Sequence, residues 1–408
     1  MPDASLSIAF VVLHTSPLDE PGTKDAGGMN VVVRAQAERL AQAGHRVQLI
    51  TRRSSPEQPD TVALSPNLAV HHLDAGPTRL LAKGEHEGLI EPFGRALAEH
   101  LDAHPVQVLH AEHWYSGLAA LPVAERLGVP LVQSYHSIAA AEHTPLTEGE
   151  RPEAPGRLLG ERRLAREADL VIAVSEAERA TVIERLGARP DRVRVVAPGV
   201  DTRLFRPCSG EECAERRAWI EHGGRPEVLI AGRLDPLKGF DLAIAAVAAI
   251  PSQRRPALRI VGAPPPDGDD YAHSLHQAVA AAGMLGTTSF DGALSRGLLA
   301  ERVREASLVL IPSHSETFGL VALEAAASGV PVIARDAGGL REAVIDGETG
   351  VLIGSDDPAE WAAAIEGLLG DPARADRMGL AGRASAVARS WEVSTARLLA
   401  VYGELLGV

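Results

Sequence analysis

Short apolar runs alternate with longer amphipathic stretches along most of the chain. In the first half, six runs have the length and composition of buried strands, at residues 8–13, 47–51, 106–109, 131–135, 170–174 and 193–196. The segments between them have helical periodicity, so the order is a repeated strand and helix. Because such crossovers make neighbouring strands parallel, this half predicts a parallel sheet with helices on both faces.

The same alternation returns in the second half. A polar stretch from Pro198-Gly199 to Pro226 separates the halves, and five more strand-like runs follow at 228–231, 258–261, 308–311, 330–334 and 351–353. Helices are expected at 241–249 and 319–327, and beyond Asp357 the pattern is helical only. We therefore expect two doubly wound, Rossmann-like domains facing across a cleft. Their expected boundaries are 1–200 and 201–390, with a helical segment 391–408 returning to the first domain.

Composition narrows the class of protein. The 408 residues exceed what one core organises, which supports two domains. The net charge of −14 disfavours a nucleic-acid partner or stable membrane association, because both require a basic face. Cys208 and Cys213 have neither redox-pair nor zinc-site spacing. We therefore expect two reduced thiols, and a cytoplasmic protein, since no export signal is visible at the start.

A basic loop follows the first strand of the second half. Residues 232–239 read Gly-Arg-Leu-Asp-Pro-Leu-Lys-Gly, between the strand at 228–231 and the next helix. Arg233 and Lys238 would therefore project from the carboxyl edge of the sheet, where α/β proteins bind ligands. Surface cations are usually solvated, but two cations on a proline-stiffened loop suit a diphosphate leaving group.

Two glutamates follow later in the same half. Glu316 and Glu324 have seven residues between them, and Glu324 lies inside the apolar run that begins after Gly319. Helix geometry places them about 12 Å apart, too far to act as paired glycosidase carboxylates. They suit the two ends of one nucleotide sugar, with the hexose at Glu316 and the ribose at Glu324. The amides of Phe318, Gly319 and Leu320 would then meet the phosphates between them.

A glycine-rich turn follows the first strand of the chain. Asp25-Ala26-Gly27-Gly28-Met29-Asn30 opens a helix, so its amides could meet a phosphate, although a simple turn capped by Asn30 explains it equally well. No Gly-x-Gly-x-x-Gly occurs here, which disfavours a dinucleotide fold. His136 follows the strand at 131–135, where catalytic groups gather, whereas His14 could merely complete a loop.

A metal site is not expected. Asp267-Gly268-Asp269 has an Asp-x-Asp pattern, but it follows three prolines in a loop where Asp and Gly commonly make turns. No His-rich or Cys-rich cluster has metal-ligand spacing. We therefore predict neither a metal nor another cofactor, and the nucleoside diphosphate sugar is a substrate.

Together these motifs resemble family 4 of the retaining glycosyltransferases, which have the GT-B architecture. Gly-Arg-Leu-x-Pro-x-Lys-Gly and Glu-x7-Glu carry the likeness in the second half. In the first half, His14-Thr15-Ser16-Pro17-Leu18, Pro21-Gly22-Thr23 and Gly27-Gly28-Met29-Asn30 are similar to one branch. That branch comprises the mycothiol-pathway enzymes that move N-acetylglucosamine from uridine diphosphate to inositol 3-phosphate. The resemblance covers nearly the whole chain.

The resemblance implies roles for individual residues. The donor would be bound by Gly27, Gly28, Asn30, Arg233, Lys238, Phe318, Gly319, Leu320 and Glu324. The catalytic group would be Arg233, Lys238, His136 and Glu316, with His136 at the transferred sugar. Such enzymes retain anomeric configuration, and the leaving phosphate oxygen takes the acceptor's proton on the same face.

The resemblance weakens on the acceptor side. The implied acceptor residues are Asn30, Lys83, Glu112, His113, Ser137 and Arg157. Lys83 and Arg157 keep the family's residue type, whereas His113 replaces a tyrosine and Ser137 a threonine. Glu112 replaces a histidine, and a carboxylate near a phosphate would weaken binding unless it is turned away or paired. A diverged acceptor, such as a natural-product intermediate, is therefore an alternative.

Other functions stay open from the sequence. A diverged antibiotic-pathway enzyme could use another nucleotide sugar, such as a GDP-sugar, with a hydroxyl or thiol acceptor. A nucleotide-sugar epimerase could share the fold but needs a close acid and base pair, and a non-catalytic sugar-nucleotide sensor would bind without transfer. Backbone contacts near residues 291–294 would recognise the base, so its identity is not predicted. A homodimer is possible.

Overall fold

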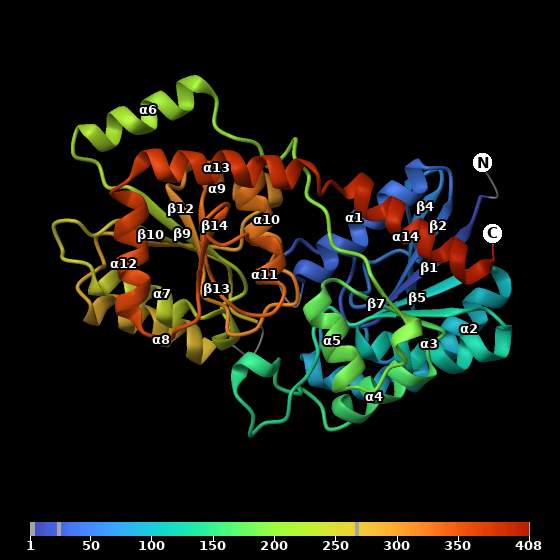
Figure 1. Cartoon of the computed structure of the whole chain (residues 1–408). Coiled ribbons are helices and arrows are strands. Elements are labelled where there is room, and N and C mark those ends of the chain that lie inside the picture. The colour runs from blue at the N-terminus through green and yellow to red at the C-terminus, as the bar shows by residue number, and fades with distance from the viewer. Residues whose placement is uncertain (1–4, 23–25, 266–268, 408) are drawn as a thin grey trace. The chain divides into compact units, whose positions relative to one another are not determined.

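The chain folds into two α/β units (Figure 1). The computed structural model describes residues 5–22, 26–265 and 269–407. The first unit comprises Met1–Asp19, Gly28–Pro198 and Trp391–Val408, and the second comprises Glu20–Gly27 and Gly199–Ser390. The grouping of Glu20–Gly27 with the second unit was not anticipated from the sequence.

The first unit is built on an eight-stranded sheet of order β3-β4-β2-β1-β5-β6-β7-β8. Every neighbouring pair is parallel except β3 and β4. The strands are β1 Ser7–Val12, β2 Arg46–Arg52, β3 Thr61–Ser65, β4 Leu68–Leu73, β5 Val108–Glu112, β6 Leu131–Ser134, β7 Leu170–Ala173 and β8 Val193–Val195.

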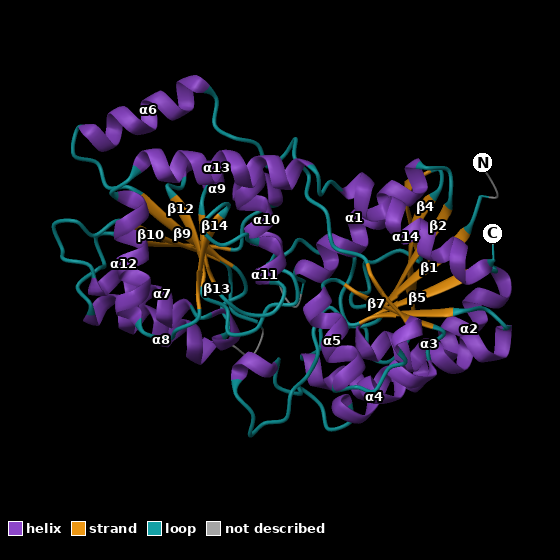
Figure 2. Cartoon of the chain, in the orientation of Figure 1, coloured by secondary structure: helices purple, strands orange, loops and turns teal. Residues whose placement is uncertain are grey.

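Helices cover both faces of this sheet (Figure 2). The helices are α1 Gly28–Gln42, α2 Ile90–Ala103, α3 His113–Leu127, α4 Arg157–Glu167, α5 Glu176–Glu184 and α14 Trp391–Leu406, with short 3-10 helices at η1 Lys83–Leu89, η2 Leu146–Glu148 and η3 Pro190–Arg192. Alternate residues of β1 point to opposite faces. Ile8 and Phe10 pack with α1 and α14, whereas Ala9 and Val11 join the core under α2 and α3.

The last helix, α14, belongs to the first unit. The Tyr402 hydroxyl lies 2.6 Å from His110 Nδ1 on β5, and both side chains are buried. The Ser394 hydroxyl donates to the Ala197 carbonyl at 2.7 Å. The first of these contacts joins the final helix to a strand that lies 292 residues earlier in the chain.

The second unit has a six-stranded parallel sheet of order β11-β10-β9-β12-β13-β14. Its strands are β9 Glu227–Ala231, β10 Ala257–Val261, β11 Thr288–Gly292, β12 Leu308–Ile311, β13 Val332–Arg335 and β14 Gly350–Ile353. Its helices are α6 Gly210–Glu221, α7 Phe240–Ala249, α8 Asp269–Ala281, α9 Arg296–Glu305, α10 Leu320–Ala327, α11 Leu340–Ala343, α12 Pro358–Leu369 and α13 Pro372–Val387, with η4 at Pro236–Lys238.

The predicted pair of doubly wound sheets is confirmed, but three strands were missed. β3 is an edge strand whose side chains are all exposed or half-buried, so it has no buried apolar run to signal it. β4 pairs with it and alternates buried with half-buried positions. β11 is a second edge strand whose side chains are all half-buried. Edge strands need less apolar sequence than central ones, because less of their surface is covered.

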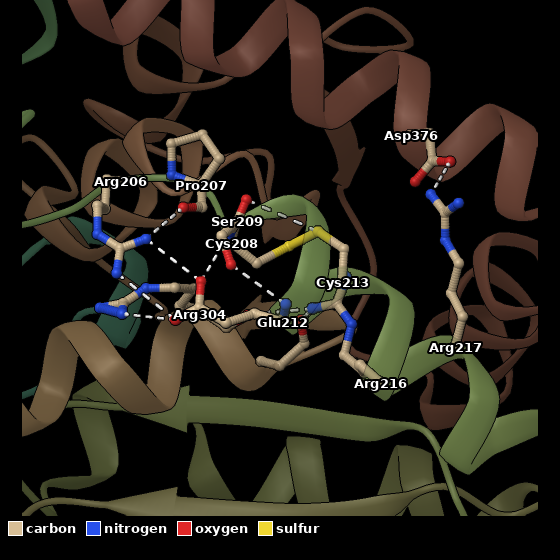
Figure 3. Close-up of a disulfide and its surroundings, with 11 residues drawn as sticks. Arg206, Pro207, Cys208, Ser209, Glu212, Cys213, Arg216, Arg217, Arg304 and Asp376 are labelled. Carbon is tan, nitrogen blue, oxygen red and sulfur yellow. Dashed lines mark hydrogen bonds and ion pairs between the residues drawn. A yellow bond between two sulfur atoms is a disulfide. The ribbon is translucent and has the colours of Figure 1, made fainter.

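The two cysteines form a disulfide, which corrects the expectation of reduced thiols (Figure 3). Ser209 is the N-cap of α6 and accepts a hydrogen bond from Glu212 N at 3.2 Å. Cys208 precedes this cap and Cys213 is the fourth helical residue, two positions that the helix start brings together. Their Cα atoms are 5.6 Å apart, within the range that a disulfide requires.

Within the described ranges, no helix combines the length and apolar character needed to cross a lipid bilayer.

Candidate active-site residues

The loop after β9 holds the two predicted cations of the second unit. Asp235 begins η4 and accepts a hydrogen bond from Leu237 N at 2.8 Å, which fixes the turn before Lys238. Gly239, the N-cap of α7, has φ of 67°, and a Cβ there would lie 2.4 Å from the Pro312 carbonyl oxygen. Only glycine fits this close approach of two loops. The loop is therefore held in one shape.

Lys238 and Glu316 meet in the second unit. Lys238 Nζ lies 2.7 Å from Glu316 Oε2, and the two side chains are 27% and 18% exposed. The contact follows from the sheet order, since β9 and β12 are neighbours and the loops after parallel neighbours meet at one edge. Arg233 is on the same loop, with a guanidinium nitrogen 4.0 Å from Asp235 Oδ2. Two carboxylates, Asp235 and Glu316, and two cations, Arg233 and Lys238, thus lie after adjacent strands.

The backbone at Glu316 is fixed by a glycine pair after β13. Gly339 N donates to the Glu316 carbonyl at 2.9 Å. Gly338 has φ of 51°, and a Cβ there would approach the same carbonyl oxygen to 2.3 Å. This pair was not predicted, although two adjacent glycines shortly after a strand-like run were a usable signal.

Glu324 is buried in α10 and has its own cation. Arg296 Nη1, at the start of α9, lies 2.6 Å from Glu324 Oε1. The Arg296 guanidinium also lies 4.7 Å from the ring centre of Phe205. Burial raises the pKa of Glu324, and the attraction to Arg296 opposes that effect. Gly319 caps α10 in a left-handed conformation with Leu320 as the first helical residue, while Phe318 is buried beside them.

In the first unit, the ends of β5 and β6 carry the predicted acceptor residues. Glu112 ends β5, His113 starts α3 and His136 lies two residues after β6. Among the residues that the structure describes, His113 and His136 are the only non-glycine residues with positive φ, at 69° and 60°. Such backbone conformations are unfavourable for side chains with a Cβ and occur preferentially at functional sites.

Glu112 is paired, as the sequence analysis required of a carboxylate at this position. His136 Nε2 lies 2.5 Å from Glu112 Oε2, and His110 Nε2 lies 3.6 Å from Glu112 Oε1. Burial alone would raise the pKa of Glu112, but the two histidines lower it. Burial alone would lower the pKa of His136, but Glu112 raises it. The two groups therefore stabilise each other's charged forms.

A second histidine group lies next to this pair. The ring centres of His14 and His113 are 4.4 Å apart, and those of His14 and His86 are 6.1 Å apart. Burial, followed by the neighbouring histidine and then by Lys83 and Arg157, holds the pKa values of His14 and His113 well below the usual range. Neither ring nitrogen of His113 has a hydrogen-bond partner among the described residues. This group is therefore uncharged at neutral pH.

Arg157 lies at the centre of an ion network that we call the acidic network: Lys83, Glu150, Glu153, Arg157 and Glu161. Arg157 donates from Nε to Glu161 at 2.8 Å, and from Nη1 to Glu150 at 3.0 Å and Glu153 at 2.5 Å. Its Nη2 donates to the Ser137 carbonyl and hydroxyl oxygens. Lys83 Nζ lies 2.9 Å from Glu150 Oε1. Burial lowers the pKa of Arg157, but the glutamates raise it overall.

Asn30 holds the loop after β1. Its Nδ2 donates to Thr15 Oγ1 at 3.2 Å and to the Ser16 carbonyl at 2.9 Å. Gly28 is the first residue of α1, and a Cβ on Gly27 would have no heavy atom within 4 Å. The glycine turn therefore leaves open space at Gly27, while the Asn30 amide is used within the fold.

Comparison with known proteins identifies the family. A model described as Glycosyltransferase Family 4 matches residues 26–204, and one described as Glycosyl transferases group 1 matches residues 212–385. The D-inositol 3-phosphate glycosyltransferase of Thermomonospora curvata is 40% identical over 410 residues, which cover 97% of this chain and 94% of that protein. The chain belongs to glycosyltransferase family 4.

Further relatives support this family 4 assignment. A D-inositol 3-phosphate glycosyltransferase of Kineococcus radiotolerans is 39% identical, covering 97% of this chain and 94% of that protein. Sucrose-phosphate synthase of Thermosynechococcus elongatus superimposes with a TM-score of 0.88 and 31% identity, covering 98% and 99% of the two chains. Anabaena HepE in complex with UDP-glucose shares the fold at 22% identity, with a TM-score of 0.77 and coverage of 98% and 100%. The predicted GT-B fold class and glycosyltransferase activity are confirmed.

The structure brings the predicted residues of this family 4 enzyme together in two groups. Arg233, Lys238, Glu316 and the start of α10 lie within the second unit, whereas Glu112, His113, His136, Ser137, Lys83 and Arg157 lie within the first. Asp267 and Gly268 of the Asp-x-Asp pattern, like Asp25 and Thr23, lie outside the described residues, and Asp269 begins α8. In the described ranges, no group of three or more His, Cys, Asp or Glu side chains is arranged to hold a metal ion.

Several partners of these side chains were missed by the sequence analysis of this glycosyltransferase. They are His110, Glu150, Glu153, Glu161, Glu178 and Arg296. Three of these residues are distant in sequence from a group they act on, namely Glu178 from His136, Arg296 from Glu324 and Glu150 from Lys83, so neither motif nor spacing identifies them. Glu153 and Glu161 each lie four residues from Arg157, a spacing typical of ion pairs in helices, and were a usable signal.

Glu178 gives a prediction for the pH dependence of stability. It is buried in α5 and accepts a hydrogen bond from Val174 N at 2.6 Å, while its Oε1 has no hydrogen-bond partner among the described residues. Burial raises the pKa of Glu178 from 4.5 to about 7. The folded protein therefore binds a proton more tightly than the unfolded chain, and this carboxyl lowers stability increasingly as pH rises from about 4.5 to 7.

We expect Glu178→Gln to remove this loss of stability with rising pH. The glutamine can still accept the Val174 bond but cannot ionise, so the variant should be about 2–3 kcal/mol more stable at pH 8, with little difference near pH 4.5. Denaturant unfolding of both proteins across this range measures the gap. A gap of equal size at every pH would contradict the assigned titration.

Proposed function

We propose that this chain is a retaining glycosyltransferase that moves a sugar from a nucleoside diphosphate sugar to a small polar acceptor. The observation that supports it most is the group after β9 and β12, where Lys238 pairs with Glu316 and Arg233 lies on the same stiffened loop. Cations fixed before the reaction can stabilise the charge that develops on a departing diphosphate without reorganisation.

In this proposal most of the residues that bind the donor belong to the second unit. Arg233 and Lys238 face the diphosphate, Glu316 accepts hydrogen bonds from hydroxyls of the transferred sugar, and Glu324 accepts them from the ribose. The amides of Phe318, Gly319 and Leu320 meet the phosphates, because the first amides of a helix lack acceptors within it. Gly27 and Gly28 allow close approach of the backbone to the donor, and Asn30 supports that turn.

The chemical step exchanges one bond at the anomeric carbon for another. The bond from that carbon to the phosphate oxygen breaks, and the acceptor's nucleophilic atom bonds to the same face. The acceptor's proton passes to the leaving phosphate oxygen, so atoms and charge balance and configuration is retained. No protein nucleophile is required, and we expect no metal requirement. As the family resemblance implies, we assign His136 to the transferred sugar, and the contact with Glu112 favours its charged form.

Separate cation partners for the two glutamates disfavour an epimerase. Glu316 pairs with Lys238 and Glu324 with Arg296. Moving a proton on and off a sugar carbon requires an acid and a base that both reach that carbon. Two carboxylates engaged on different cations, with one buried in a helix, are better suited to holding separate parts of a ligand.

The proposal is tested by nucleotide binding followed by turnover. Thermal shifts with uridine, guanosine and deoxythymidine diphosphates identify the base, and the matching nucleotide sugars are then incubated with candidate acceptors. We expect diphosphate release that depends on the acceptor, with a glycosylated product of unchanged anomeric configuration. A new nucleotide sugar without acceptor would indicate an epimerase, and binding without product from any acceptor would indicate a sensor.

A further inference from the structure

The acidic network uses both cations among the residues that the family resemblance assigns to the acceptor, Lys83 and Arg157. All five N–H groups of Arg157 have an acceptor within the protein, and its side chain is 0% exposed. Lys83 is paired with Glu150, whose other oxygen accepts from Arg157. A phosphate at this position would have to replace a carboxylate that is already in place.

The charge of the acidic network also opposes an anion. Three glutamates surround two cations, so the group carries a net negative charge of one when all are ionised. The adjacent Glu112 and His136 form a charge-balanced pair and add no positive charge. Bringing a phosphate dianion to an acidic, largely buried group is unfavourable, because like charges repel strongly where water is scarce.

The unused hydrogen-bonding groups nearby are uncharged. Both ring nitrogens of His113 and Nδ1 of His14 lack hydrogen-bond partners among the described residues. His113 is buried, and its strained backbone holds the ring against His14. A neutral imidazole offers one donor and one acceptor, which complements a hydroxyl or thiol group. Buried polar atoms without partners are rare, and they point to a missing ligand or water.

We propose that the acceptor of this enzyme carries no phosphate and is an uncharged, hydroxyl- or thiol-bearing molecule that His113 recognises. This inference rests on the proposed glycosyltransferase function and specifies its acceptor class. The proposed acceptor differs from inositol 3-phosphate, the compound after which the relatives are named. His113 and Glu112, which replace a tyrosine and a histidine of the resembled family, are the departures that accompany it.

The decisive comparison uses a matched pair of probes. Calorimetry with inositol and inositol 3-phosphate, in the presence of the nucleotide that the thermal shifts select, isolates the contribution of one phosphate group. We expect the phosphate to add no affinity, and diphosphate release to proceed with acceptors from a panel of uncharged alcohols and thiols. Binding of inositol 3-phosphate at least tenfold tighter than inositol, or release that requires a phosphorylated acceptor, would overturn the proposal.

Glu150→Gln tests the charge argument directly. The glutamine can occupy the same space, but it removes the carboxylate shared by Lys83 and Arg157, so the network becomes neutral. We expect the variant to bind inositol 3-phosphate at least tenfold more tightly than the wild type does. Glu85→Gln is the matched control, because Glu85 lies on the same 3-10 helix as Lys83 and pairs with exposed Arg79. Equally tight binding by the wild type and Glu150→Gln would count against the proposal.

The outcomes distinguish this inference from the proposed function. If no nucleoside diphosphate binds, the glycosyltransferase proposal itself fails. If nucleotide binds and sugar is transferred only to a phosphorylated acceptor, the function stands and only the phosphate-free acceptor is wrong. The wild-type comparison needs no variant, so the test does not depend on the folding of Glu150→Gln.

Discussion

Replacing Lys238 with alanine is expected to lower turnover at saturating donor by about 10²–10³, the usual effect of losing one preorganised charge-stabilising donor. The ammonium is fixed in advance by its 2.7 Å contact with Glu316 and by the turn between Asp235 and Gly239. The charge it stabilises grows as the bond to the diphosphate breaks. Its loss should therefore affect the chemical step more than donor binding.

We expect Lys238→Ala to fold normally. Lys238 and Glu316 are both partly exposed, so water can solvate the carboxylate that is left alone. The measurement compares turnover and unfolding midpoint for wild type and Lys238→Ala, with Arg254→Ala as a matched control. Arg254 is a more exposed cation of the same unit, paired with Glu366 at 3.2 Å. Near wild-type turnover in Lys238→Ala would rule out the assigned role.

Lys238→Arg refines the interpretation. Arginine keeps the positive charge but places it on a longer, planar group that cannot occupy the ammonium's position beside Glu316. Partial recovery of turnover would show that charge carries most of the effect. If arginine is as inactive as alanine, the position of the ammonium matters as much as its charge.

The sequence predicted the elements that are buried on both sides. Central strands such as β1, β9 and β12 are continuous apolar runs, because parallel strands between helix layers contact apolar groups on both faces. The edge strands β3 and β11 lack this signal because they are only half covered. The disulfide was missed because its formation depends on where α6 begins rather than on cysteine spacing.

The candidate residues were predictable where they belong to one local motif. Arg233 and Lys238 lie on one loop, and Glu316 with Gly319 lies on another, so residue type and position sufficed. Other pairs join residues from different strands or helices. Glu112 meets His136 because β5 and β6 are neighbours, and Glu324 meets Arg296 because α10 contacts α9. Such pairs depend on the packing of distant segments, which the sequence pattern did not resolve.

Arg157→Met is expected to destabilise the first unit by about 3–5 kcal/mol, the usual cost of removing one partner from a buried ion pair. Methionine fills part of the volume but leaves Glu150, Glu153 and Glu161 without their shared cation. These carboxylates would then favour their protonated forms. The loss should therefore be largest at high pH and shrink as pH falls toward the range in which glutamates bind protons.

The control for this change lies on the same helix. Arg163 of α4 pairs with Glu167 at 2.9 Å on the exposed face, so Arg163→Met should cost less than about 1 kcal/mol. Denaturant unfolding at pH 5.5 and pH 8 compares the two variants with wild type.

Adding Glu161→Met to Arg157→Met should recover part of the lost stability, because it removes the most deeply buried unpaired charge. If Arg157→Met is as stable as Arg163→Met, the acidic network does not support the fold. That result would contradict the structural role assigned to Arg157.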